Sequence, residues 1–396
     1  HLPKTERRFY DEPTRLEFEA VVLDVFDNHI VLDNTFFYAE GGGQLSDIGT
    51  ITVEDAVYQV VDTQDYNGVI IHTVENSNGH LEIRKGDIAT GEVDEKRRIA
   101  LSRHHTATHI INDVARKVLG KHIWQTGAQK FEDRSRLDIS HYKHISPEEL
   151  RQIELLANHM VMENKRVVTE WITRTEAEQG YGFGLYQGGV PTGEKIRIVK
   201  VGDDVEACGG THCLSTGLIG PIKILRSERI QDGVERIEFA AGTAAVLAMQ
   251  KIESLLTDSA KILSVPPEHL PISVERFFGE WKDLNKENER LKEELGHSIA
   301  YKLLEDSLKV VDLKVIVELV PGADILELQK IAAEFLKHEE VVALLVSDVE
   351  GVKIVTAVGD KALKLGIDAN NLVREVAKIV GGGGGGKPSL AMGGGT

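Results

Sequence analysis

Long hydrophobic runs are missing from this 396-residue chain, and cysteine is rare, with only two residues. No segment reaches the roughly 18 consecutive apolar residues typical of a transmembrane helix, so we expect no membrane association. The first eight residues also lack the apolar core of a secretory signal peptide. The two cysteines, Cys208 and Cys213, are five positions apart and do not make a disulfide framework. These features predict a cytoplasmic protein.

Positive charge is also scarce. The chain has 46 Lys and Arg against 63 Asp and Glu, a formal net charge of −17. This balance argues against non-specific binding of nucleic acid, which depends on neutralising phosphates. Basic residues nevertheless gather around one histidine motif, at Arg84, Lys85, Lys96, Arg97, Arg98, Arg103, Arg116, Lys117 and Lys121. Charge alone is equally consistent with a site for a phosphate-bearing substrate and with a solvated helix face.

Both cysteines belong to one short motif, Cys-Gly-Gly-Thr-His-Cys at residues 208–213. About a hundred residues earlier, His105 and His109 stand four positions apart in a helical pattern, so both imidazoles project from one face. Three His and one Cys suit tetrahedral zinc, and either half alone would be weak evidence. The combination predicts one Zn²⁺ held by His105, His109, Cys208 and His212.

Two neighbouring residues are expected to stay out of the ligand set. Cys213 directly follows His212, so its geometry at the same metal would be strained. His104 lies about 100° around the helix from His105, which places it behind the ligands or at the surface.

The chain is expected to be an α+β multidomain protein with four segments. Short alternating runs punctuated by Asn, Asp and Gly predict a small β-barrel over residues 1–92. This predicted barrel contains the segment Gly41, Gly42, Gly43 and Gln44. The segment could be a simple turn or a loop whose backbone amides approach a ligand, and the sequence favours the turn. Residues 93–242 are predicted to form a zinc-binding α+β core. Its expected elements are helices at 96–120 and 147–164 and strands at 135–140, 166–173, 196–201, 218–226 and 235–240.

The remaining two segments are a helical stretch over 243–306 and a small α/β domain over 307–396. A heptad pattern in the helical stretch indicates either self-association or packing of a helical hairpin within the chain; it runs through Val274, Phe277, Trp281, Leu284, Asn288, Leu291 and Leu295. The chain ends in a glycine-rich tail from Gly381, which suggests a disordered tail or a phosphate-cradling loop beside Lys387. The tail does not match the P-loop spacing.

Together these motifs resemble a known family. HxxxH, followed by CGGTH and preceded by TxFYxExGGQ from Thr35 to Gln44, resembles the editing domain of alanyl-tRNA synthetase and the free-standing editing proteins called AlaX. The tail GGGGGGKPSLAMGGG resembles the DHHA1-type RNA-binding domain that ends both. The segment GFGLYQGGVPTGEKIRIV looks like the archaeal synthetase. The resemblance leaves two identities open, namely the C-terminal half of an archaeal-type synthetase and the long form of AlaX.

The resemblance implies a zinc-dependent hydrolase that removes serine or glycine from tRNA(Ala) and spares alanine. It assigns an editing-site role to Gln125, rejection of alanine to Thr35, and substrate binding to the loop Gly41–Gln44. A pocket built for a methyl group cannot strongly exclude glycine or serine, so a second site must correct errors. A threonine hydroxyl can bond serine but not alanine, and an unpaired buried polar group costs about 1–3 kcal/mol.

Several alternatives stay open at this point. With three protein ligands the zinc would activate a water, and with four it would position the substrate, which four good ligands favour. The expected partners are tRNA(Ala) carrying serine or glycine and a second copy of the chain, through the helical and C-terminal region. The rival functions are a threonyl-type editing domain, a non-catalytic zinc-stabilised tRNA-binding module, and a small-molecule zinc hydrolase, which the missing HExxH motif disfavours.

Overall fold

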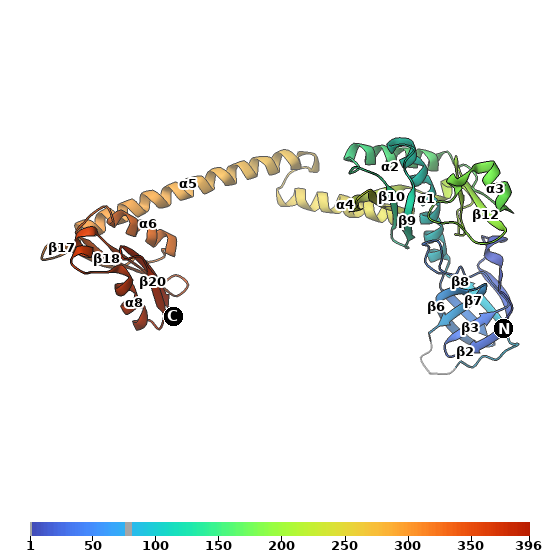
Figure 1. Ribbon diagram of the computed structural model, residues 1–396, viewed down its shortest axis with the longest axis horizontal. Helices are drawn as coiled ribbons and strands as arrows, with labels where there is room; N and C mark the ends of the chain where they lie inside the picture. The colour runs from blue at the N-terminus through green and yellow to red at the C-terminus, as the bar shows by residue number, and fades with distance from the viewer. Residues whose placement is uncertain (1, 76–80) are drawn as a thin grey trace. The chain divides into compact units, whose positions relative to one another are not determined.

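The computed structural model describes residues 2–75 and 81–396 (Figure 1). The chain divides into two compact units, His1–Asp258 and Ser259–Thr396. Among the described residues, no helix has the length and apolar character needed to cross a membrane.

The first unit begins with a closed barrel of six strands in the order β2-β3-β7-β6-β5-β8. Alternate side chains of β2, such as Phe18, Ala20 and Val22, fill its interior, because successive side chains of a strand point to opposite faces. The barrel confirms the small β-barrel predicted near the N-terminus. Its strands are β2 (Glu17–Phe26), β3 (His29–Leu32), β5 (Gly49–Val53), β6 (Ala56–Tyr66), β7 (Val69–Val74) and β8 (Ile88–Val93).

Helix α1 (Glu95–Leu119) follows the barrel directly and forms the centre of the first unit. Asp94 caps its start by accepting a hydrogen bond from the Arg97 N–H, and Gly120 ends it, as predicted. Most residues from Leu101 to Ala115 are buried, so this helix has neighbours on nearly every side. It packs against α2 (Pro147–Met162) and against strands of the sheet β14-β15-β10-β9. The four strands are β9 (Gln125–Lys130), β10 (Ser135–Ser140), β14 (Ile222–Gln231) and β15 (Val234–Ala241).

The predicted elements of this core match the structure closely, with one correction. Ser146 caps α2 in a reciprocal capping box with Glu149, and Pro147 occupies the first helical position. The strand expected to start at residue 218 starts instead at Ile222, because Thr216–Ile219 forms a 3₁₀ turn (η3) that ends at Gly220 with φ 73°.

A three-stranded sheet carries the chain toward the cysteine motif. Its order is β11-β12-β13, with β11 at Val168–Thr173, β12 at Lys195–Val201 and β13 at Asp204–Ala207. Helix α3 (Arg174–Tyr181) and a 3₁₀ turn (Phe183–Leu185) lie between β11 and β12 in the chain. Strand β13 touches α1 and ends one residue before Cys208, which brings the cysteine motif to the helix that carries the histidines.

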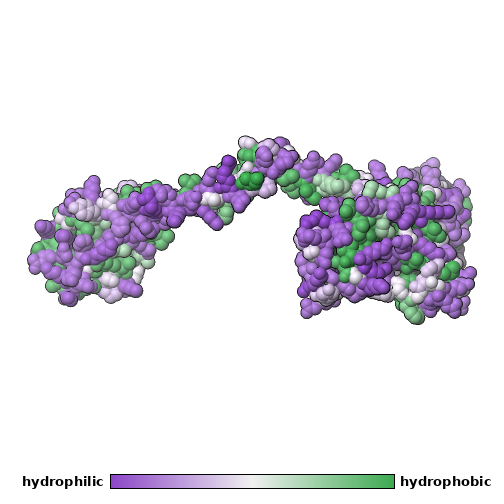
Figure 2. Space-filling model, turned by 90° about the horizontal axis from the view of Figure 1, so that it is seen from above, coloured by the Kyte–Doolittle hydropathy of each residue, from purple (hydrophilic) through white to green (hydrophobic). Residues whose placement is uncertain are grey.

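Two helices, α4 (Thr243–Ile262) and α5 (Leu270–Glu305), form the predicted helical stretch. The apolar positions of the predicted heptad on α5 are 45–68% exposed in the single chain. Figure 2 shows hydrophobic side chains at the surface along this helix. Within the second unit, no other element covers these heptad positions.

The second unit ends in a mixed six-stranded sheet of order β16-β17-β18-β19-β21-β20. Helix α6 (Ile325–Phe335) and the end of α5 cover one face, while α7 (Asp360–Lys364) and α8 (Ala369–Ile379) cover the other. The arrangement confirms the predicted α/β character. The strands are β16 (Leu308–Val310), β17 (Leu313–Leu319), β18 (Val341–Ser347), β19 (Val352–Val358), β20 (Gly383–Gly386) and β21 (Leu390–Gly395).

The glycine-rich tail is not disordered, and that interpretation was wrong. Its glycines form the antiparallel pair β20 and β21, where several of them leave no room for a side chain. A Cβ added to Gly382 would come within 1.7 Å of the Gly394 carbonyl oxygen. The glycines also leave room for α8, because a Cβ on Gly393 would meet Val373 at 2.9 Å. The tail is glycine-rich because the sheet packs tightly there.

Candidate metal centre and adjoining cavity

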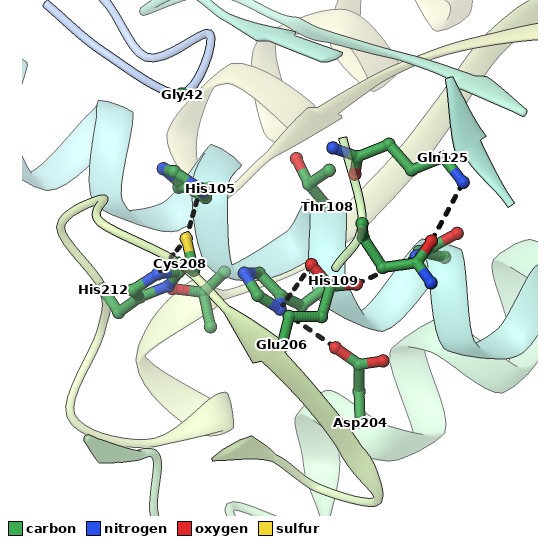
Figure 3. Close-up of polar contacts among 12 residues, drawn as sticks. Gly42, His105, Thr108, His109, Gln125, Asp204, Glu206, Cys208 and His212 are labelled. Atoms are coloured by element: carbon green, nitrogen blue, oxygen red, sulfur yellow. Dashed lines mark hydrogen bonds and ion pairs between the residues drawn. The ribbon is translucent and has the colours of Figure 1, made fainter. Parts of the chain in front are cut away.

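Four side chains from two distant segments meet beside α1. His105 and His109 come from the buried part of this helix, and Cys208 and His212 come from the loop after β13. One potential ligand atom from each residue lies within 4.8 Å of all the others. The Cys208 Sγ is 3.2 Å from His105 Nε2 and 3.4 Å from His212 Nε2 (Figure 3). This cluster can bind a metal ion.

The hydrogen bonds around His105 determine which of its ring nitrogens is free. The Thr211 backbone N–H donates to Gln44 Oε1 at 3.0 Å, so this atom of the amide must be the oxygen. The same oxygen lies 2.7 Å from His105 Nδ1 and can only accept from it. The neutral His105 therefore carries its proton on Nδ1 and turns an unprotonated Nε2 toward Cys208.

The other two imidazoles are fixed in the same way. Thr106 Oγ1 donates to the Ser102 carbonyl at 2.7 Å, so it accepts from the Cys213 N–H at 3.0 Å and from His212 Nδ1 at 3.2 Å. His109 Nδ1 lies 3.0 Å from a carboxylate oxygen of Asp204. All three rings thus leave Nε2 for the cluster, the arrangement that metal-binding histidines adopt.

The electrostatics of the cluster also fit a metal site. Burial lowers the pKa of both His105 and His212 well below the ordinary value, which keeps them in the neutral form that a metal requires. Burial acts to raise the pKa of the Cys208 thiol, but the hydrogen bond and charge of His109 more than reverse this, so its pKa is lowered. Burial acts to lower the pKa of His109, but Glu206 and Asp204 more than reverse this and raise it well above the ordinary value. The donor set is therefore two neutral imidazoles, the His109 imidazole, which gives up its proton when a metal binds, and one thiol biased toward thiolate.

The Gly-Gly step in the cysteine motif has a steric cause. A Cβ added to Gly210 would lie 2.0 Å from the His105 ring, so only glycine fits there. The loop is held from behind by Arg197, whose guanidinium donates to the carbonyls of Cys208 at 3.0 Å and Gly210 at 2.8 Å.

A cavity of about 500 Å³ opens beside the cluster, and His105, His109 and Cys208 form part of its wall. The predicted glycine loop contributes Gly42 and Gly43, and the loop 187–191 covers another side. Gly43 has φ 72°, and a Cβ there would meet the Ala128 carbonyl at 2.0 Å. The loop is thus both a tight turn, closed by hydrogen bonds between Gly41 and Gln44, and a cavity wall.

The structure gives different positions to Gln125, predicted as catalytic, and to the loop Gly41–Gln44, predicted to bind substrate. Gln125, the first residue of β9, lines the cavity, and its backbone N–H donates to Gln187 Oε1 at 3.0 Å. Gly41 and Gln44 are not among the residues that line it. Gln44 instead lies behind His105, where it holds the ring in place.

Thr35 is not brought to the cavity, which corrects the expectation drawn from the resemblance. It lies in β4 (Asn34–Thr35), which pairs with β1 (Glu6–Arg7), and it is fully buried. Its hydroxyl lies 2.9 Å from His72 Nε2 and accepts a hydrogen bond from the Phe37 N–H at 3.1 Å. His72 Nδ1 donates to the Ile30 carbonyl at 3.1 Å, so the Thr35 hydroxyl is the donor to Nε2. The barrel interior therefore uses both hydrogen-bonding functions of Thr35.

His104 and Cys213 both lie outside the ligand group. His104 is not at the surface, as one interpretation had it. It is buried, donates from Nδ1 to the Ala100 carbonyl at 3.0 Å, and accepts from the Ala241 N–H at 3.1 Å. Burial lowers its pKa to about 4. The thiol of Cys213 is also shielded, and burial raises its pKa to about 11.

Sequence reasoning missed Glu206. This residue lines the cavity, accepts a hydrogen bond from Asn112 Nδ2 at 2.9 Å, and lies 3.4 Å from His109 Nδ1. Burial raises its pKa to about 7. A sequence signal existed, because Asp204, Glu206 and Cys208 are spaced by two along an extended segment and so share one face.

Lys130, the last residue of β9, was also missed. It is 2% exposed and lines the same cavity, and its ammonium donates to the Gly42 carbonyl at 2.8 Å. Nothing in the local sequence distinguishes it from a surface lysine.

Three family models match the chain. They are described as tRNA synthetases class II (A) over residues 4–97, the Threonyl and Alanyl tRNA synthetase second additional domain over residues 196–238, and the DHHA1 domain over residues 312–396. The second match covers β12, β13 and the cysteine motif, and the third covers most of the C-terminal sheet.

Curated relatives match along the whole chain. The alanine–tRNA ligases of Methanosarcina mazei and Methanosarcina acetivorans are 79% and 78% identical over 396 residues, which is 100% of this chain and 43% of each relative. That of Pyrococcus abyssi is 49% identical over 395 residues, 99% of this chain and 42% of the relative. A crystal structure of the C-Ala domain from Aquifex aeolicus alanyl-tRNA synthetase is 27% identical, with TM-score 0.21, and covers 22% of this chain and 81% of that one.

The chain spans less than half the length of these curated relatives, and the identity extends over 99–100% of the chain. Of the two identities left open by the sequence, these matches support the synthetase. The chain belongs to the archaeal alanyl-tRNA synthetase family and corresponds to its C-terminal portion.

Proposed function

We propose that this chain hydrolyses the ester that joins serine or glycine to tRNA(Ala) and spares alanine, with one Zn²⁺ held by His105, His109, Cys208 and His212. The observation that carries the proposal is the convergence of three imidazole Nε2 atoms and a thiol at the wall of one cavity. Three nitrogens and one sulfur are a donor set that zinc prefers. The bound ion would supply a fixed positive charge beside the substrate.

Four protein ligands leave no open position, so this donor set favours positioning of the substrate over activation of a metal-bound water. The attacking water is then held by polar side chains of the cavity. Gln125 can both donate and accept hydrogen bonds, and the carboxyl group of Glu206 can accept one, and both residues line the cavity. We assign these two residues to orienting the water and the ester.

Selectivity against alanine requires a polar group near the substrate's side chain that a methyl group would leave unpaired. Thr108 and Gln125 both line the cavity and can bond a serine hydroxyl, whereas Thr35 is occupied inside the barrel. Glycine has no side chain, so a water can take the place of that hydroxyl. Alanine fills the place without bonding, which costs about 1–3 kcal/mol.

The test is amino-acid release from Ser-tRNA(Ala), Gly-tRNA(Ala) and Ala-tRNA(Ala), with and without a zinc chelator and after zinc is restored. We expect release of serine and glycine, little release of alanine, and loss and recovery of activity with the metal. Binding of tRNA without release of any amino acid would instead establish a non-catalytic binding module.

A parallel assay with Ser-tRNA(Thr) separates the threonyl-type alternative, since the second additional domain occurs in both synthetases by its description. We expect serine release from tRNA(Ala) to be faster. The reverse preference would assign the site to the threonine system.

A further inference from the structure

The cavity contains the buried ammonium of Lys130, which forms no ion pair in the described part of the chain. Burial lowers its pKa, and the charges of Cys208 and Glu206 act in the opposite direction. Lys130 is 2% exposed, yet within the described residues no carboxylate oxygen lies within ion-pair distance of its ammonium. Of the buried arginines of this unit, Arg98 forms an ion pair with Asp47, and Arg197 makes two hydrogen bonds to backbone carbonyls where Lys130 makes one.

The hydrogen bonds of Lys130 are also incomplete. An ammonium has three protons to donate, and the described protein groups accept one of them, at the Gly42 carbonyl. Burying a charged group without full compensation is costly, so such a group is retained where it serves a purpose. An oxygen of a ligand in the cavity would supply the missing acceptor.

The backbone fixes this ammonium relative to the metal centre. The Lys130 N–H donates to the Gly43 carbonyl at 2.7 Å, and Lys130 forms a parallel bridge with Gln44. Gln44 in turn holds the ring of His105. The cavity wall therefore presents the charge of Lys130 and the His105 ligand as one rigid arrangement.

We propose that Lys130 is a catalytic residue, whose ammonium donates a hydrogen bond to the carbonyl oxygen of the scissile ester and stabilises the negative charge that develops there. The proposal rests on the deacylation proposed above. A preformed donor aimed at a developing oxyanion in a site shielded from water accelerates ester hydrolysis strongly.

The step is balanced without an oxidant or reductant. A water oxygen bonds to the ester carbon, and the π electron pair moves to the carbonyl oxygen beside Lys130. When that pair re-forms the double bond, the bond between the ester carbon and the ribose oxygen breaks. The proton lost by the water is matched by one gained by the ribose oxygen, which gives free amino acid and tRNA.

Lysine could instead bind a phosphate of the terminal nucleotides, and the kinetics separate the two roles. A phosphate carries its charge before and during the reaction, so removal of a lysine that binds it would raise KM and leave kcat unchanged. The oxyanion exists only in the transition state, so removal of a lysine that stabilises it would lower kcat.

The experiment compares wild-type chain with Lys130→Gln, Lys130→Arg and Lys251→Gln, an exposed lysine on α4. Single-turnover release of serine from Ser-tRNA(Ala) is measured per zinc-loaded chain, together with KM, zinc content and Tm. For Lys130→Gln we expect kcat to fall about 10²–10³-fold. We expect KM to change less than about threefold, zinc content to stay at one per chain, and Tm to stay equal or rise, because a buried unpaired charge has been removed.

Lys130→Arg should retain more activity than Lys130→Gln, because it keeps the charge, and Lys251→Gln should match wild type. A raised KM with unchanged kcat would overturn the proposal in favour of phosphate binding. A lowered Tm or loss of zinc in Lys130→Gln would overturn it in favour of a structural role for the bond to Gly42. If wild-type chain releases no serine, the proposed function itself fails, a result distinct from any outcome in the variants.

Discussion

At the scale of single residues, the groups behind the ligands matter as much as the ligands. Gln44, Thr106 and Asp204 each accept a hydrogen bond from the outward nitrogen of one imidazole, which turns all three Nε2 atoms inward. Two of these acceptors, Gln44 and Thr106, are uncharged groups whose other hydrogen bonds to backbone N–H groups leave no alternative orientation. These hydrogen bonds therefore orient the three imidazole rings before any metal binds.

Replacement of Gln44 tests this organisation. Gln44→Leu removes the acceptor behind His105 while nearly keeping the volume of the side chain. We expect zinc affinity to fall about 10–100-fold, as for other partners of ligating histidines. Competition against a chelator of known affinity measures this, with the exposed Gln152→Ala as the matched control. Unchanged affinity would show that His105 is oriented by packing alone.

Thr35 allows a test of its place in the barrel. Thr35→Val keeps the shape but leaves His72 Nε2 and the Phe37 N–H without their partner. We expect a loss of about 1–3 kcal/mol in the free energy of unfolding and an unchanged ratio of serine to alanine release. Urea unfolding and the release assay measure the two effects. If Thr35→Val has normal stability and releases alanine, Thr35 takes part in rejecting alanine and the structural role is wrong.

His72 makes the stability of the barrel depend on pH. Burial lowers its pKa to about 4, from an ordinary value near 6.5. The unfolded chain therefore binds more protons between these values, so this contribution to stability is complete above about pH 6.5 and is lost as the pH falls toward 4. Its slope reaches at most about 1.4 kcal/mol per pH unit.

The measurement is the urea midpoint of the zinc-loaded chain at pH 7 and pH 5. His72→Gln cannot titrate, so the difference between the two midpoints should be smaller than in wild type. Equal differences in both proteins would mean that other groups dominate the acid sensitivity.

At the scale of elements, a long buried helix and a glycine-containing loop build the site together. Helix α1 holds His105 and His109 one turn apart, and β13 delivers Cys208 to them. The loop closes onto the helix only because Gly210 has no side chain, since the His105 ring occupies that space.

The two adjacent glycines provide a matched comparison. Gly210→Ala places a methyl group 2.0 Å from the His105 ring, whereas a Cβ at Gly209 meets only the Tyr10 hydroxyl, at 3.5 Å. We expect Gly210→Ala to lose most bound zinc and Gly209→Ala to keep it, because neither residue has a positive φ that would add backbone strain. Zinc per chain after gel filtration measures this. Equal zinc in both variants would mean that the loop adjusts without cost.

At the scale of the whole molecule, the exposed seam of α5 favours the homodimer expected from the sequence. A stripe that includes Phe277, Trp281 and Leu284 is more apolar than a solvated helix requires, and the second unit itself leaves it open. We propose that a second copy covers it. The net charge of −17 opposes association of two copies at low salt.

Sedimentation equilibrium tests the dimer. We expect a concentration-dependent dimer in wild type and at least a tenfold weaker one in Leu284→Glu, with Lys286→Glu, outside the seam, as the control. A monomer at all concentrations would contradict the proposed dimer.

The sequence predicted many of the elements of this protein and its cluster of candidate metal ligands. Helix α1, the capped α2 and the barrel follow from periodicity, caps and turn residues, which are local. The ligand set was predictable because His and Cys are scarce, and their spacing placed each pair on one face or one turn. Zinc as the metal and deacylation as the activity remain proposals.

Tertiary structure decided what the remaining candidates do. Thr35 is engaged by His72, which is 37 residues away, and Gln44 lies behind a ligand instead of in the cavity. The glycine tail is ordered because strands from distant positions pair with it. Lys130 is buried, although lysine side chains are usually exposed. In each case the deciding partner is remote in the chain, so no local pattern encodes it.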